Sequence, residues 1–238
     1  MENHGIAYLG ENGGNTIHHK WNSILSTVRA TQQQLFKNVA KKTYSEAFGI
    51  SKRVGRNLWE LLTPVLPDPG NKEIHQGIDI AIYRWLLGNP LDAQHPMNTI
   101  PYITGFQFNE EYSLQEILNL TVTANRKENN SVVITIPSFN PIKNIVSPVQ
   151  TDSIKFKILA VSCRMDGAKT DGGITELNVP YNDVLVPEQN ILLPLKPEEG
   201  SLIVVAMALE FNNSDHSEAY NFNNKHFTPA GIVWAGYN

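Results

Sequence analysis

The stretch Ser153–Arg164, SIKFKILAVSCR, decides the fold class of this 238-residue chain. Its first half alternates, with Ile154, Phe156 and Ile158 separated by lysines. Successive side chains of a β-strand point to opposite faces of a sheet, so this alternation predicts a strand with one buried face. The single cysteine, Cys163, lies in the same run and is predicted to be a small buried apolar side chain.

Similar but shorter apolar runs on both sides of this stretch predict seven further strands. They cover residues 102–108, 117–123, 132–136, 174–179, 190–195, 201–211 and 231–236. The connections between them are rich in Gly, Asn and Pro, and no helical pattern interrupts them. This spacing favours an antiparallel β-sandwich of the immunoglobulin or fibronectin type over residues 102–238.

The first part of the chain has a different period, with apolar residues recurring every three or four positions. This period predicts helices over residues 16–48, 51–62 and 72–87. Gly49 is expected to end the first of them, and Pro64 to close the second. We therefore predict an α+β fold, in which a helical region (16–90) is followed by a linker (91–101) and the β-sandwich. Residues 1–15, rich in Gly and Asn, are expected to form a flexible arm that orders on a partner.

The net charge of −4 is unevenly distributed. Residues 15–60 carry eight Lys or Arg against Glu46 and Glu60, whereas residues 61–238 carry a net charge of −8. The basic helical face is expected to comprise Lys37, Lys41, Lys42, Lys52, Arg53 and Arg56. This separation indicates a solvated basic face, and it leaves open contact between the basic part of one molecule and the acidic part of another.

The run GISKRVGR at residues 49–56 has some similarity to the turn and second helix of a helix-turn-helix. In that motif, basic side chains of the second helix contact phosphates and base edges. Gly55 would stand inside the recognition helix, where it costs about 1 kcal/mol relative to alanine. The acidic balance of the whole chain also argues against nucleic-acid binding, which we keep as an alternative.

No catalytic, metal-binding or nucleotide-binding motif is complete in the sequence. His18 and His19 are adjacent, so on a helix their side chains point about 100° apart and cannot bind one metal ion together. Residues 166–173 lack the spacing of a phosphate-binding loop and of an EF-hand. We therefore predict a protein that is not an enzyme and needs no cofactor or metal.

The sequence also lacks the signals of a membrane or secreted protein. No apolar run approaches the roughly 20 residues that span a bilayer, and residues 1–14 have no apolar core of the kind found in signal peptides. We expect a cytoplasmic protein without membrane insertion, and leave open an export route that needs no leader.

Three stretches resemble a run shared by a group of uncharacterised proteins common in Bacteroidetes: ITIPSFNP at residues 134–141, VSP at 146–148 and SIKFKILAV at 153–161. Residues 55–58 and 227–233 are also similar to that group. The resemblance covers about residues 50–238 and implies a bacterial origin, a basic helical N-terminal half and a β-rich C-terminal half. The chain departs from the group at its start, which has no glycine-rich β-hairpin. The resemblance carries over no catalytic residue.

Our leading functional hypothesis is a non-enzymatic structural or interaction protein that self-associates into a homo-oligomer or filament. Separated charge and a flexible arm suit head-to-tail contacts, which form rings or filaments. Trp234 and Tyr237 are the aromatic residues expected at a contact. The alternatives are a nucleic-acid-binding module on the basic helices, and a sandwich that binds carbohydrate or peptide through loops 124–131, 165–173 and 212–226.

Overall fold

A computed structural model describes residues 41–88, 99–127, 131–213 and 227–238, without the side chains of residues 41–43 and 169–171. Within it, Ser45–Asn238 form one compact unit. The predicted arm (1–15), most of the first predicted helix and most of the predicted linker lie outside the described residues. The predicted domain boundaries therefore stay predictions.

Helix α2 spans Lys41–Leu62 and is followed by the 3-10 turn η1, Thr63–Val65. The prediction that Gly49 ends a helix is wrong, because α2 continues through it. One exposed glycine costs a helix only about 1 kcal/mol, and packing of a long apolar face outweighs that cost. The buried positions of this helix include Ala47, Val54, Leu58, Trp59 and Leu62.

Helix α3 spans Lys72–Gly88 and confirms the helix predicted over residues 72–87. Asn71 caps it, since its Oδ1 accepts hydrogen bonds from the backbone N–H groups of Glu73 and Ile74, at 3.0 and 3.1 Å. Its buried side chains include Ile74, Ile78, Ile82, Trp85 and Leu86. Among the described residues, no helix combines the length and the apolar character that crossing a membrane requires.

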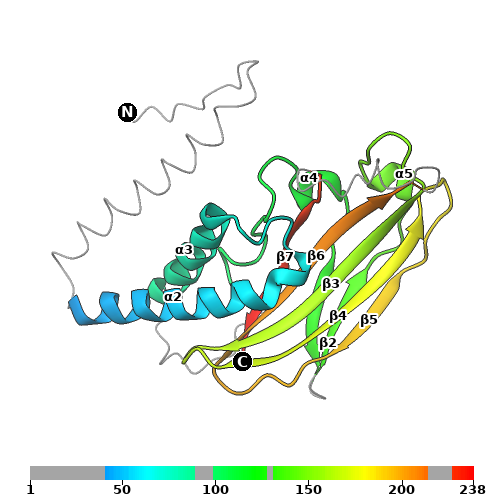
Figure 1. The fold of residues 1–238 in the computed structure, drawn as a ribbon. Coiled ribbons are helices and arrows are strands. Elements are labelled where there is room, and N and C mark those ends of the chain that lie inside the picture. The colour runs from blue at the N-terminus through cyan, green and yellow to red at the C-terminus, as the bar shows by residue number, and fades with distance from the viewer. Residues whose placement is uncertain (1–40, 89–98, 128–130, 214–226) are drawn as a thin grey trace, which may run out of the picture. The chain divides into compact units, whose positions relative to one another are not determined.

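Seven strands form two antiparallel sheets (Figure 1). The strand order of the larger sheet is β4-β3-β6-β7, and that of the smaller is β1-β2-β5. The bounds are β1 Thr123–Lys127, β2 Ser131–Ile136, β3 Ser153–Arg164, β4 Lys169–Pro180, β5 Gln189–Pro194, β6 Ser201–Asn212 and β7 Ala230–Tyr237. Two short helices, α4 (Leu114–Ile117) and α5 (Pro141–Asn144), lie between the strands in sequence.

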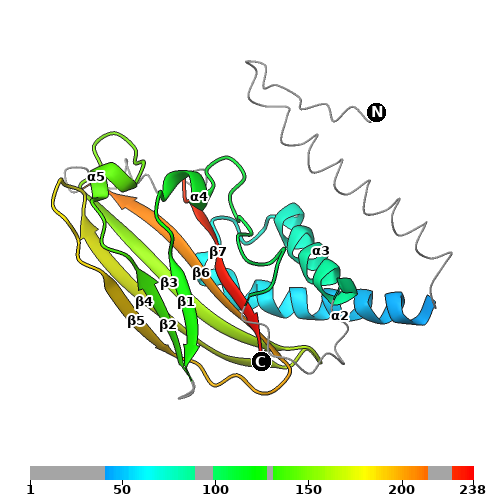
Figure 2. The ribbon, with the colours of Figure 1, turned by 180° about the vertical axis from the view of Figure 1, so that it is seen from behind.

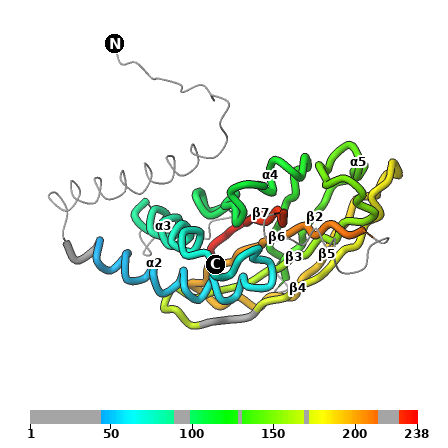
Figure 3. Tube along the Cα trace, turned by 45° about the horizontal axis from the view of Figure 1, so that its top comes forward, coloured from blue at the N-terminus to red at the C-terminus, as the bar shows by residue number. Residues whose placement is uncertain are grey.

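The four-stranded sheet is the middle of three layers (Figures 1 and 2). One face packs on the three-stranded sheet through side chains such as Phe156 and Val205. On the opposite face, Val161 and Val204 belong to a second core that includes α2 and α3. These helices lie beside one end of the strands, and α5 lies at the other end (Figure 3). Strands β3 and β6 pair in one unbroken register, from Ser153 opposite Asn212 to Arg164 opposite Ser201.

The α+β class, with N-terminal helices and two antiparallel sheets, is confirmed, while the immunoglobulin- or fibronectin-like topology stays a prediction. Six of the predicted strands correspond to β2 through β7. The predicted strand over 102–108 is wrong, because these residues form turns along β7. The predicted strand over 117–123 is also wrong, because α4 ends at Ile117, Leu118 forms only an isolated bridge with Ile145, Leu120 lies in a bend, and only Thr123 belongs to a strand, β1. Strand β1 was missed.

The two glycines of α2 have different surroundings, which generates a paired prediction. A Cβ at Gly55 would lie 1.9 Å from Oδ1 of Asp79 on α3, whereas a Cβ at Gly49 would meet no atom within 4 Å. We expect Gly55→Ala to lower the free energy of unfolding by about 1–3 kcal/mol through overpacking. Gly49→Ala should raise it by about 0.5–1 kcal/mol through its higher helix propensity. Urea denaturation followed by circular dichroism measures both, and equal stabilisation by the two changes would contradict the close approach of α2 and α3.

Candidate functional site

A groove of about 430 Å³ opens where the edge of β7 lies close to the segment that leads into β1. Figure 2 shows β1, β7 and α4 around this part of the molecule. We call it the edge groove. It is lined by Thr104, Gly105 and Gln107, by Leu114 and Gln115, by residues 118–122, and by Ile232 and Val233.

One wall of the edge groove is a turn that follows the outer edge of β7. Gly105 donates its backbone N–H to the carbonyl of Ile232 at 2.8 Å, and Ile232 donates to the carbonyl of Phe106 at 2.7 Å. Gly105 has a φ of +84°, which favours glycine. Gln107 fixes α4 to this turn, because its Oε1 accepts a hydrogen bond from the backbone N–H of Leu114 at 2.7 Å.

Val233, on the same wall, is the extra residue of a β-bulge. Its neighbours Ile232 and Trp234 pair with Ala206 and Val205 of β6, so Val233 has no partner there. Bulges re-aim side chains and are frequent beside binding sites. Here the bulge places Val233 among the lining residues of the edge groove.

The opposite wall has polar groups that no other described residue uses. The backbone N–H and C=O groups of Leu120 and of Thr121 form no hydrogen bond within the described part of the chain. The same holds for the side chains of Gln115, Asn119 and Thr121, all of which are exposed. These groups are therefore available to a ligand, at the cost of displacing water.

The lining chemistry restricts what the edge groove can recognise. Its side chains are aliphatic, hydroxyl or amide, and none is charged at neutral pH. Such a surface suits an uncharged, extended polypeptide, which is held by main-chain hydrogen bonds and by apolar side chains. Within the described residues, no group of three or more His, Cys, Asp or Glu is placed to hold a metal ion.

The predicted basic face is only partly described. Lys37 and the side chains of Lys41 and Lys42 lie outside the described residues. Helix α2 brings Lys52, Arg53 and Arg56 together, all exposed. Lys52 is engaged within the chain, since its Nζ lies 2.8 Å from Oδ2 of Asp79 and 5.7 Å from the centroid of the Phe48 ring.

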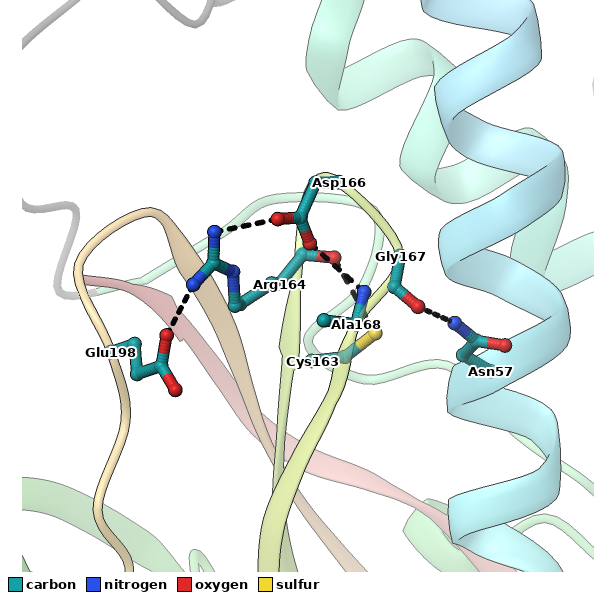
Figure 4. A network of polar contacts seen from close by, with 7 residues as sticks. All are labelled: Asn57, Cys163, Arg164, Asp166, Gly167, Ala168 and Glu198. Atoms are coloured by element: carbon teal, nitrogen blue, oxygen red, sulfur yellow. Dashed lines mark hydrogen bonds and ion pairs between the residues drawn. The ribbon is translucent and has the colours of Figure 1, made fainter.

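Arg53 and Asn57 contact the turn between β3 and β4 (Figure 4). A Cβ at Gly167 would lie 2.5 Å from Cγ of Arg53, so the arginine stem covers this glycine, whose φ is +88°. The Asn57 side chain donates to the carbonyl of Gly167. This contact ties the end of the β3–β4 hairpin to α2, and Arg53 takes part in it.

The same turn is braced by an ion pair network (Figure 4). The Arg164 guanidinium pairs with Oδ2 of Asp166 at 2.6 Å and with the carboxylate of Glu198. The backbone N–H of Ala168 and the Arg164 side chain both donate to Asp166, and these bonds lower the pKa of its carboxyl. The described polar groups of the predicted loop 165–173 are thus used to fix the turn.

The structure describes the two predicted contact aromatics fully and the two remaining predicted binding loops only in part. Trp234 and Tyr237 are half-buried on β7 and pack against the two cores. The Tyr237 ring lies 5.3 Å from the Trp85 ring, centroid to centroid, and burial raises the pKa of its hydroxyl. In the predicted loop 124–131, residues 124–127 form β1, while loop 212–226 lies almost entirely outside the described residues. Their roles at a contact stay predictions.

Sequence reasoning missed the edge groove. The alternation of Leu118, Leu120 and Val122 in the sequence predicts a paired strand and gives no sign of a groove.

Comparison with protein-family models and with curated proteins finds no match. The resemblance to the Bacteroidetes group therefore stays a prediction, and the helices followed by antiparallel sheets are the part that the structure supports.

Asp79 is the buried carboxyl at the contact of α2 with α3, with a side chain only 7% exposed. Burial raises its pKa above the ordinary value of 3.8, and the hydrogen bond and charge of Lys52, with His75 and Arg56 nearby, act in the opposite direction. Its Oδ1 has no hydrogen-bond partner among the described residues and lies against Gly55. A buried oxygen without a partner is costly when it is charged.

This raised pKa predicts a pH dependence of stability. A carboxyl with a raised pKa in the folded state stabilises the fold fully below its unfolded value, 3.8, and loses this contribution as the pH rises through the folded pKa. We expect the free energy of unfolding of the wild type to fall relative to that of Asp79→Asn as the pH rises above 3.8. Urea denaturation of both proteins at several pH values on either side measures this. A difference that does not vary with pH would show that the pKa is not raised.

Proposed function

We propose that this chain is a non-enzymatic interaction protein that self-associates, and that the edge groove is one of the surfaces it uses. The observation that carries the proposal is the set of backbone N–H and C=O groups of Leu120 and Thr121, which line an uncharged groove and have no hydrogen-bond partner in the described residues. Free backbone N–H and C=O groups beside a groove can bond to the main chain of a bound polypeptide.

The chemistry of the groove supports binding of polypeptide. A strand added to a sheet edge gains affinity from main-chain hydrogen bonds and specificity from side-chain pockets. Leu120, Val122 and Val233 are half-buried lining residues and provide apolar surface for such contacts. No side chain of the lining is a base, an acid or an activated nucleophile, which supports a role in binding.

A second exposed apolar surface supports self-association. Ile142, Val146 and Val149, in and after α5, are 50%, 58% and 83% exposed, and Val184 and Leu185 before β5 are each 64% exposed. The two loops are adjacent, because Asp183 accepts a hydrogen bond from Asn140 and pairs with Lys143. Exposed apolar clusters mark interaction sites. Assembly is head to tail where one such surface binds a different surface of the next copy.

The proposed immunoglobulin- or fibronectin-like sandwich fits this role, since many cell-surface domains are built that way. The basic residues of α2 are the basis of the alternative, a nucleic-acid-binding module. Salt separates the two, because contacts of basic side chains with phosphates weaken steeply with salt concentration, whereas an uncharged groove is little affected.

We expect the wild-type protein to show concentration-dependent assembly in light scattering coupled to size exclusion, at low and at high salt. Thr121→Trp places an indole in the edge groove and should weaken assembly by at least about tenfold. Thr123→Trp is the matched control, since Thr123 is also exposed but does not line the groove. A wild-type protein that stays monomeric at high concentration in both buffers would contradict self-association.

A further inference from the structure

We propose that the edge groove receives residues 5–10, GIAYLG, from the N-terminal arm of a second copy of this chain. This inference rests on the proposed self-association and identifies the segment that the edge groove binds. The segment belongs to residues 1–40, which lie outside the described part of the chain.

The chemistry of the segment matches that of the edge groove. Residues 5–10 carry no charge, and Glu2 and Glu11 stand on either side of them. In an extended conformation, Ile6 and Tyr8 point to one side and Ala7 and Leu9 to the other, so either face presents apolar side chains. The groove offers aliphatic side chains with amide and hydroxyl groups and no charge, so the segment can enter it without burying an ion.

The backbone of the segment also finds partners in the groove. The free N–H and C=O groups of Leu120 and Thr121 can form hydrogen bonds with the backbone of the bound segment. Gly5 and Gly10 bracket the apolar residues, and glycine permits close approach of one backbone to another. Six extended residues span roughly 20 Å, which is the length of an ordinary strand.

The arm is long enough to reach a neighbour. Residues 11–44 separate the segment from the compact unit that begins at Ser45. If residues 16–44 are helical, as predicted, they extend about 44 Å, and residues 11–15 add about 17 Å. Together these exceed the diameter of roughly 40 Å expected for a compact unit of this size. Each copy then donates one arm and receives another, which builds rings or filaments.

Two variants of the full chain test the pairing. Leu9→Asp places a charge on the arm segment, and Thr121→Trp fills the groove. Each alone should weaken assembly in light scattering by at least about tenfold, because a buried unpaired charge or a blocked groove removes the contact. Asn15→Asp, outside the segment, and Thr123→Trp, outside the groove, are matched controls that should assemble as the wild type does. Near-ultraviolet circular dichroism checks that every variant is folded.

Mixing the two variants distinguishes a second copy from the chain's own arm. The Thr121→Trp chain keeps an intact arm, and the Leu9→Asp chain keeps an open groove, so a mixture allows one arm-to-groove contact and no more. We expect the mixture to form a complex that contains one chain of each kind, which neither variant forms alone. A mixture that stays monomeric, although each variant alone has lost assembly, would overturn the proposed pairing between copies.

The remaining outcomes separate the two proposals. If the wild type assembles and both variants assemble equally well, the arm does not bind the groove, while self-association stands on another surface. If the wild type is a monomer, self-association is wrong and the arm does not bind a second copy.

Discussion

The four-stranded sheet is covered on both faces over part of its length, and the other layers depend on this constraint. Residues 202–209 of β6 are each buried, with even-numbered side chains toward the helices and odd-numbered ones toward the smaller sheet. A strand between two layers needs a continuous apolar run, which this sequence provides. Strand β3 marks where the helical layer ends, because Leu159 faces α2 and α3 whereas Lys155, on the same face, pairs with Glu176 and Glu210.

Local periodicity predicted the elements that such burial produces. Helix α3 and strands β3 and β6 have long, regular apolar patterns, and the structure confirms them. The prediction that a helix ends at Gly49 is wrong because it considered the glycine alone. The buried face of α2 continues beyond Gly49 and keeps the helix intact. Residues 102–108 misled it in another way: their apolar residues cover the edge of β7 from a turn, with a φ of +72° at Tyr102 and +84° at Gly105. Strand β1 was missed because it is polar, and Ala124 is its one buried residue.

The edge groove could not be predicted, because its lining joins Thr104 with Val233, and no sequence motif connects them. The sequence shows the local excess of basic residues, but it does not show which contacts each basic side chain makes within the chain. Lys52 neutralises part of the cost of burying Asp79, and the stem of Arg53 covers Gly167. Gly55, which looked misplaced in a recognition helix, is required by the carboxylate of Asp79 that lies against it. A count of charges in a sequence therefore overestimates the free basic surface.

The two sides of the sheet pair are closed differently. At one side, a Cβ at Gly173 of β4 would lie 3.4 Å from the carbonyl oxygen of Pro194 in β5, so these two edges are in contact. At the other side, the turn over residues 102–108 covers the edge of β7, but the backbone of Leu120 and Thr121 is left without a partner among the described residues. Uncovered edges invite aggregation, and proteins usually protect them. The backbone groups of Leu120 and Thr121 lie outside both sheets, so no strand of the described residues protects them.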